Sequence, residues 1–300
     1  MQRSFTVLDG GLSTVLEAAG HDLHHDLWTA RLITEQPEAL MDAHLAFLRA
    51  GAEVVITASY QASVSGFEAE GLTRAEAEAA LRSTTALARA AVGDGTALVA
   101  ASVGPFGATL ANGSEYHGRY GIDHDDLRAF HRSRLELLID SSPDLLAIET
   151  IPTVAEARAL GEALDGLDAP PIWFAFTCSD GAHTAGGDRI EDAITVASGI
   201  PGVAAVGVNC TSPEHIGELL RRAATVTDLP LLAYANGGQV WNSALGVWEG
   251  PPVAADDRAV IGEWLDAGAR IVGGCCGVGA SGIAGLRAWR DELDPRAEAF

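Results

Sequence analysis

Lysine is absent from this 300-residue chain, whose 19 basic residues are all arginine. Without lysine the protein cannot form the Schiff base on which pyridoxal-phosphate enzymes and lysine-type aldolases depend. Basic residues are also outnumbered, because 41 acidic residues bring the formal net charge to −22. Such an excess of negative charge repels nucleic acid and anionic membrane surfaces, so neither is expected as a partner.

Long apolar runs are absent as well. No stretch reaches the roughly 20 apolar residues that a membrane-spanning helix requires. The chain starts with a polar segment and a short apolar run, without the charged head and long apolar body of a signal peptide. These features predict a cytoplasmic protein, and in that reducing compartment its 4 cysteines are not expected to form a disulfide framework.

Two familiar motifs are missing too. No GxGxxG fingerprint follows the first predicted strand, where the chain reads Asp9-Gly10-Gly11. No CxxC pair occurs, so the cysteines lack the spacing that is common in closed structural zinc sites. These absences argue against an open nucleotide-binding sheet and against a structural zinc module.

Eight short apolar segments recur along the chain, and amphipathic helical stretches such as 37–50 and 74–92 separate most of them. Nearly continuous apolar runs such as LLAIET and VAAVGVN suit a parallel sheet covered on both faces. The alternation predicts an α/β fold, a (β/α)8 TIM-type barrel that forms a single domain over residues 1–300. The predicted strands are residues 5–9, 53–59, 98–104, 144–150, 171–177, 203–209, 229–236 and 270–275.

The C-terminal ends of these strands predict the place of the active site, because catalytic residues of such barrels gather at that rim. Polar strand ends are common wherever loops begin, which accounts for Ser59 and Thr177 but not for several cysteines. The residues at the predicted strand ends are Asp9, Ser59, Gly104, Glu149, Thr177, Cys210, Asn236, Cys275 and Cys276.

Cys210 ends the sixth predicted strand, and Cys275 and Cys276 end the eighth. Adjacent residues point to opposite sides of a strand, so this pair can share a metal only if the backbone turns there. Flanking glycines supply that freedom. Three protein ligands with an open fourth position are the catalytic arrangement of zinc.

Other interpretations of the cysteines stay open. The three thiols can be buried side chains without a ligand, or Cys275 and Cys276 can be a redox-active pair that does not involve Cys210. We interpret Cys178 as a spectator, since free cysteine is among the residues most often buried. The position of the other three at strand ends favours a metal.

A zinc ion held by three thiolates has a formal charge of −1 and is a weak Lewis acid. It can keep a substrate thiol deprotonated near neutral pH, although a free thiol has a pKa of about 8.5. The sulfur stays electron-rich and nucleophilic. The chemistry that this site suits is alkyl transfer to sulfur.

Blocks along nearly the whole chain resemble the homocysteine S-methyltransferases, whose barrels carry zinc cysteines in GVNC and GGCC. Seven blocks occur in the family's order, which is far more specific than GGCC alone. They are DGG at 9–11, ITASYQAS at 56–63, VGPFGATLANGSEYHGRYG at 103–121, AIET at 147–150, FTCSDG at 176–181, VNCTSP at 208–213 and GGCCG at 273–277.

The resemblance implies a zinc enzyme that binds homocysteine by its thiol and methylates it to methionine, with no catalytic group beyond the zinc centre. It implies that Asp9, Gly10 and Glu149 hold the amino-acid end of homocysteine, where a carboxylate suits an ammonium group. The zinc ligands would be Cys210, Cys275 and Cys276, and further substrate-binding positions would be Ser59, Asn209 and Asn236.

Residues 111–121 resemble the branch that uses S-methylmethionine, with S-adenosylmethionine as a lesser donor, more than the betaine or folate branches. Sulfonium donors are cations, so an acidic and aromatic entrance would attract them. The alternative is a surface loop with scattered aromatic residues. The candidates for this entrance are Glu115, Tyr116, Tyr120, Trp241 and Trp248.

Two segments depart from the family pattern. Residues 235–239 read ANGGQ instead of the usual PNSGE, and residues 278–280 read VGA where TTP is frequent. Both flank the predicted metal site without removing a ligand, so they bear on the choice of donor and on loop shape.

Two further functions are compatible with the sequence. Glycine-rich segments after the last two strands are where many barrels bind phosphate, which would suit a lyase or isomerase. A zinc or redox sensor would bind metal without forming methionine. The sequence does not indicate an oligomeric state.

Overall fold

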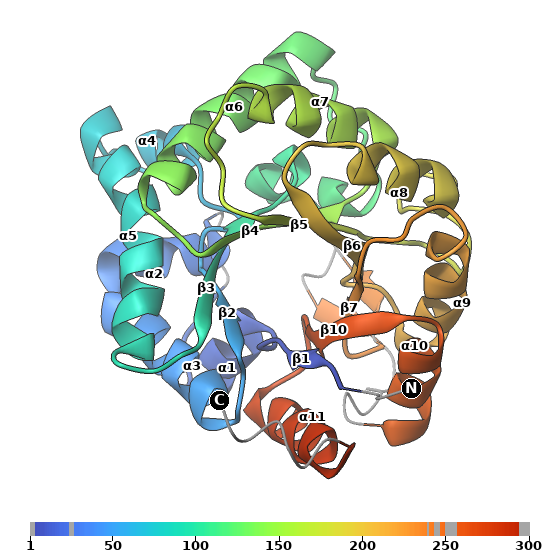
Figure 1. The fold of residues 1–300 in the computed structure, drawn as a ribbon. Coiled ribbons are helices and arrows are strands. Elements are labelled where there is room, and N and C mark those ends of the chain that lie inside the picture. The colour runs from blue at the N-terminus through green and yellow to red at the C-terminus, as the bar shows by residue number, and fades with distance from the viewer. Residues whose placement is uncertain (1–3, 24–26, 239, 243–246, 250–256, 294–300) are drawn as a thin grey trace.

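The computed structural model describes residues 4–23, 27–238, 240–242, 247–249 and 257–293, and its main sheet has eight parallel strands. Their order is β1, β10, β7, β6, β5, β4, β3, β2, so each strand lies beside the next strand of that sheet along the chain. Figure 1 looks along the barrel, with the strands at the centre. The strands are β1 (Thr6–Val7), β2 (Val54–Ile56), β3 (Leu98–Val103), β4 (Leu145–Ile151), β5 (Ile172–Phe176), β6 (Val203–Asn209), β7 (Leu231–Ala235) and β10 (Ala269–Gly274).

Hydrogen bonds between β1 and β2 close the sheet into a barrel. The amide nitrogen of Glu53 donates to the carbonyl oxygen of Val7 at 2.8 Å, and that of Asp9 donates to Val54 at 3.1 Å. A parallel bridge between Leu8 and Val54 lies between them. The predicted (β/α)8 barrel is therefore confirmed.

Helices surround the barrel (Figure 1). The predicted helix over 74–92 is confirmed as α5, which begins with a capping box between Thr73 and Glu76. The predicted helix over 37–50 is α3. The helices are α1 (Leu12–Ala18), α2 (Arg31–Glu35), α3 (Pro37–Arg49), α4 (Val64–Ala69), α5 (Arg74–Val92), α6 (His124–Asp140), α7 (Val154–Leu164), α8 (Ile190–Ser198), α9 (Pro213–Ala223), α10 (Arg258–Asp266) and α11 (Ala280–Leu293), with short 3-10 helices η1 (Trp28–Ala30), η2 (Phe106–Leu110) and η3 (Ser114–Tyr116).

Side chains alternate between the helix-facing and the inner side of each strand. In β4, Leu146 and Ile148 belong to the core cluster shared with the helices, whereas Ala147 belongs to the cluster inside the barrel. Glu149 shares the face of Ala147, and Tyr234 of β7 lies in the same inner cluster. The period of two therefore brings a carboxylate and a phenol into the barrel interior.

Strands β1 and β2 are shorter than the predicted strands 5–9 and 53–59. The carboxylate of Asp9 accepts a hydrogen bond from the amide nitrogen of Ile56 at 2.8 Å. Where β2 ends, the side chain of Asp9 thus takes the place of a backbone carbonyl of the neighbouring strand. Ser59, which was predicted to be part of this strand, lies in the turn that follows.

An unpredicted antiparallel pair, β8 (Val240–Asn242) and β9 (Val247–Glu249), interrupts the connection from β7 to α10. The connection from β3 to α6 is also long and contains η2 and η3. Long connections at the C-terminal ends of strands are where barrels of this type build their sites.

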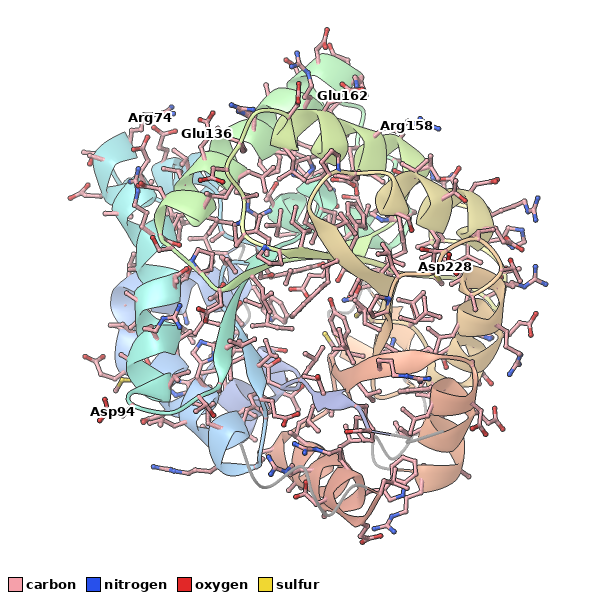
Figure 2. All side chains as sticks on the ribbon, viewed as in Figure 1. Arg74, Asp94, Glu136, Arg158, Glu162 and Asp228 are labelled. Atoms are coloured by element: carbon pink, nitrogen blue, oxygen red, sulfur yellow. The ribbon has the colours of Figure 1, made fainter. Side chains whose placement is uncertain are left out.

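The outer ring of helices exposes many charged side chains. Exposed side chains such as Glu136 of α6 and Arg158 and Glu162 of α7 point away from the barrel (Figure 2). Within the described residues, no helix has the length and apolar character needed to cross a membrane.

Candidate active site

Three cysteines meet at the C-terminal rim of the barrel. The sulfur atoms of Cys210, Cys275 and Cys276 all lie within 4.8 Å of one another. Cys210 follows β6 directly and its amide nitrogen donates to the carbonyl oxygen of Tyr234 in β7 at 3.0 Å. Cys275 follows β10, and its amide donates to Ala235 of β7 at 2.7 Å. Strand β7, which lies between β6 and β10, therefore sets the distance between the cysteines.

The backbone turns at both cysteine positions. Cys210 has a φ of +47°, in the left-handed region that non-glycine residues seldom adopt. After β10, the amide nitrogen of Val278 donates to the carbonyl oxygen of Cys275 at 3.0 Å and closes a turn. Gly277 within it has a φ of +82°. This turn brings the sulfurs of Cys275 and Cys276 to one place, as their use of a common ligand requires.

The chemistry of this donor set fits a metal ion. Hydrogen bonds from Cys275 and Cys276 lower the pKa of the Cys210 thiol well below its ordinary value, and the same bonds raise the pKa of Cys275 and Cys276, so the cluster favours a thiolate at Cys210. Cys275 and Cys276 are half-buried and line the cavity described next. Three sulfur ligands with access to a cavity suit a soft metal with an open position.

A cavity of about 540 Å³ opens beside the cysteines. Its size is in the range of small-molecule sites. No arginine or histidine is found among the described residues of its lining, whereas three glutamates are. The lining is Gly10, Gly11, Leu12, Ser13, Glu17, Leu23, Trp28, Thr29, Ile56, Thr57, Ala58, Tyr60, Gln61, Ala108, Ala111, Asn112, Gly113, Glu115, Tyr116, Glu149, Thr150, Cys210, Tyr234, Gly274, Cys275 and Cys276.

Glu149 enters the cavity from the inner face of β4. Its Oε1 accepts a hydrogen bond from the hydroxyl of Ser102, and its Oε2 accepts one from the hydroxyl of Tyr234 at 3.0 Å. Burial raises the pKa of the Glu149 carboxyl to about 7, against the effect of both hydrogen bonds. The group therefore changes charge near neutral pH, and a bound cation would favour its ionised form.

Asp9 lies close enough to Glu149 for their charges to interact. Burial raises the pKa of Asp9 well above its ordinary value, and the charge of Glu149 adds to this rise. Asp9 is 1% exposed, and its Oδ1 has no hydrogen-bond partner among the described residues. Two neighbouring buried carboxyls, one with an unsatisfied oxygen, form a site that suits an ammonium group.

Gly10 lines the cavity next to Asp9. A Cβ atom at this position would lie 2.4 Å from the carbonyl oxygen of Val278 and 2.8 Å from the ring of Phe47. The backbone at residue 10 is therefore packed directly against the turn that follows the cysteine pair, and only glycine fits.

Asp9 is not itself part of the lining, and neither are three other predicted substrate positions. The hydroxyl of Ser59 donates to the carbonyl oxygen of Ser102 at 2.7 Å. The side chain of Asn209 accepts from the amide of Thr150 at 2.7 Å and donates to its hydroxyl at 2.8 Å. The amide of Asn236 lies 3.4 Å from the carbonyl oxygen of Cys210. In this structure, Ser59 links the turn after β2 to β3, and Asn209 links β6 to β4.

The predicted donor residues are distributed unevenly. Glu115 and Tyr116 line the cavity, and the hydroxyl of Tyr116 lies 3.7 Å from the sulfur of Cys210. Tyr120 instead donates to the buried carboxylate of Glu156 at 2.7 Å. The side chains of the predicted residues Trp241 and Trp248 lie outside what the structure describes, although their backbones pair in β8 and β9.

Cys178 does not join the sulfur cluster found among the described residues. It is buried, and its amide nitrogen donates a hydrogen bond to the hydroxyl of Thr211, in the loop after β6, at 3.0 Å. Burial raises the pKa of the Cys178 thiol above its ordinary value, so this cysteine stays protonated near neutral pH.

Several lining residues were not predicted from the sequence. Tyr60 and Gln61 follow β2 within the block at 56–63, where their position after a strand was an available signal. Trp28 and Thr29 come from η1, before α2, and Trp28 has a φ of +46°. Nothing in the local sequence around η1 distinguishes it from an ordinary helical connection.

The chain is similar to known methyltransferases over most of its length. The family model described as homocysteine S-methyltransferase matches residues 6–289. Homocysteine S-methyltransferase 4 of Zea mays is 42% identical over 290 residues, 90% of this chain and 84% of that protein. Homocysteine S-methyltransferase of Escherichia coli (strain K12) is 40% identical over 296 residues, 96% of each. The metallated crystal structure of Escherichia coli homocysteine methyltransferase MmuM has a TM-score of 0.85 and 39% identity, covering 95% of this chain and 96% of that one.

Proposed function

Because this chain belongs to the homocysteine S-methyltransferase family, we propose that it transfers a methyl group from a sulfonium donor to the thiol of homocysteine and forms methionine. S-methylmethionine is the first candidate donor and S-adenosylmethionine the second. The observation that carries the proposal is the convergence of Cys210, Cys275 and Cys276 on a cavity that Glu149 also lines, with the buried Asp9 beside Glu149.

Zinc is the metal that we assign to the three cysteines. Three thiolates with one open position match catalytic zinc sites, and sulfur ligands disfavour the hard cations Mg²⁺ and Ca²⁺. When bound, zinc would keep the substrate thiol deprotonated near neutral pH while leaving its sulfur nucleophilic.

Asp9 and Glu149 would bind the ammonium group of homocysteine. The unsatisfied Oδ1 of Asp9 accepts a hydrogen bond from this group. The positive charge of the ammonium favours ionisation of both carboxyls, whose pKa values are raised in its absence. Ser102 and Tyr234 hold the carboxylate of Glu149 in place. The amino-acid end is thereby fixed with its thiol directed to the cysteines.

The methyl transfer is a displacement at carbon. The bond between the donor sulfur and the methyl carbon breaks, and its electron pair stays on the leaving sulfur. A lone pair of the homocysteine sulfur forms the new bond, after the thiol proton has passed to solvent. No side chain needs to act as a base in this step, so the protein contributes mainly by holding the two sulfurs on opposite sides of the methyl carbon.

A phosphate-binding lyase or isomerase is less compatible with the cavity. Arginine and histidine are missing from its described lining, whereas phosphate sites commonly use such cations together with backbone amides. The cytoplasmic location and the absence of a nucleic-acid partner remain predictions from the composition.

The proposal is tested by incubating the protein and homocysteine with S-methylmethionine, S-adenosylmethionine or betaine, each with and without a strong chelator. We expect methionine from the sulfonium donors and loss of activity with the chelator. Methionine formed only from betaine would overturn the donor assignment. Zinc binding without methionine from any donor would favour a sensor and overturn the enzymatic proposal.

A further inference from the structure

The connection from β3 to α6 places a carboxylate in the cavity that the binding of homocysteine does not use. Glu115 of η3 lines the cavity together with Tyr60, Tyr116 and Cys210. Its Oε2 atom is buried and has no hydrogen-bond partner among the described residues. An unsatisfied buried carboxylate oxygen is costly, so this position favours a ligand that brings positive charge.

The surroundings of Glu115 suit a cation without N–H groups. The described lining contains no arginine or histidine that would neutralise the carboxylate. The cavity is also lined by the aromatic residues Trp28, Tyr60 and Tyr116, and aromatic faces attract cations. A sulfonium centre has no conventional hydrogen-bond donor, so charge and aromatic faces are the interactions available to recognise it.

The position of Glu115 relative to the cysteines agrees with the geometry of the transfer. The hydroxyl of the adjacent Tyr116 lies 3.7 Å from the sulfur of Cys210. The charge of Cys210 contributes to the raised pKa of Glu115, after burial. A cation beside Glu115 would therefore lie near the cysteine cluster, where the acceptor thiol is proposed to bind.

We propose that Glu115 is the counter-charge for the sulfonium centre of the methyl donor and determines the preference for a positively charged donor over a neutral thioether. This inference rests on the proposed function. It also accounts for release of the product, because demethylation turns the donor into a neutral thioether that no longer pairs with the carboxylate.

The loop holds Glu115 in a defined position. A Cβ atom at Gly107 would lie 2.5 Å from the amide nitrogen of Glu115, so η2 packs directly against η3. The amide of Gly118 donates to the carbonyl oxygen of Ser114 at 2.8 Å and closes the turn around it. The bond from Tyr120 to Glu156 then ties the end of this loop to α7.

The test is steady-state kinetics of Glu115→Gln at saturating homocysteine. We expect the KM for S-methylmethionine to rise about tenfold or more, because a buried charge loses its partner. The KM for homocysteine should stay unchanged. The inhibition constant of methionine, measured as a competitor of the donor, should also stay unchanged, because methionine keeps the ammonium group but lacks the sulfonium charge.

Two variants serve as comparisons. Glu68→Gln removes an exposed charge from α4 and should leave the donor KM at the wild-type value. Glu115→Asp keeps the charge on a shorter side chain and should give a donor KM between wild type and Glu115→Gln. It also preserves the test if the glutamine variant does not fold.

The outcomes separate the two proposals. A wild-type protein that uses no sulfonium donor contradicts the proposed function itself. An active wild type with an unchanged donor KM in Glu115→Gln overturns only the inference about Glu115. Equal increases in the donor KM and in the inhibition constant of methionine would assign Glu115 to an ammonium group and would also overturn it.

Discussion

The hydroxyl of Tyr234 donates to Oε2 of Glu149 at 3.0 Å and joins strand β7 to strand β4 through the barrel interior. This bond lowers the pKa of Glu149, which burial raises to about 7. In Tyr234→Phe the pKa of Glu149 should therefore rise further. We expect the KM for homocysteine at pH 7 to increase about tenfold or more, because a hydrogen bond to a charged group contributes about 1.5–3 kcal/mol. Measured from pH 6 to 9, the KM should approach the wild-type value on the alkaline side, and an unshifted profile would contradict this role.

Replacing Glu149 by glutamine should stabilise the protein at alkaline pH while reducing activity. The carboxyl ionises near 4.5 in an unfolded chain but near 7 in the folded protein. Between these values the folded state binds more protons, so its stability falls as pH rises through this window. The variant avoids that loss, which is at most about 3 kcal/mol. Urea unfolding at pH 5 and pH 8 measures the difference in the free energy of unfolding between Glu149→Gln and wild type, with the exposed Glu136→Gln as control. The same difference at both pH values would refute the explanation.

Cysteine substitutions test the metal site. Cys210→Ala should lose both bound metal and turnover, because a site of three sulfur ligands loses one of them. Cys178→Ala should retain both, since Cys178 does not belong to the cluster. Metal content by mass spectrometry and methionine formation are measured on the same preparations. A fully metal-loaded and active Cys210→Ala would exclude the assignment.

Arg134 of α6 is buried and supports the loop after β2. Its guanidinium donates to the carbonyl oxygens of Gly104 at 2.9 Å, Tyr60 at 2.5 Å and Ser59. Arg134→Met should destabilise the protein by about 3 kcal/mol, because buried carbonyl groups lose charged donors. It should also lower kcat/KM through displacement of Tyr60. The prediction is checked by urea unfolding of Arg134→Met and of a control, Arg128→Met, which changes a half-exposed arginine. Equal free energies of unfolding for the two variants would contradict it.

The fold could be predicted from the sequence because parallel strands buried on both faces leave nearly continuous apolar runs. The predicted segment 203–209 coincides with β6, and 144–150 is displaced by one residue from β4. Strands β1 and β2 were predicted too long, because the amide nitrogen of Ile56 donates to the carboxylate of Asp9 instead of to a backbone carbonyl. That exchange depends on a contact between distant residues, and no local pattern reveals it.

The site could be predicted in part for a similar reason. Polar residues at strand ends are visible in a sequence, and Cys210 and Glu149 were found by this signal. Tyr234 was not, because a tyrosine within an apolar strand resembles any other core residue until its hydroxyl partner is known. Trp28 was not predicted either, because the connection before α2 that contains it is brought to the cavity only by the tertiary fold.

At Cys210, the left-handed backbone conformation and the proposed metal-binding role favour different residues. At a φ of +47°, an L-residue costs about 1–2 kcal/mol that glycine would not, and asparagine tolerates this region better than most. Random mutation toward those residues would relax the backbone and stabilise the barrel while removing a sulfur. Cysteine therefore occupies this position against the folding preference of its own backbone, so the residue that the metal site requires is not the residue that the fold would favour.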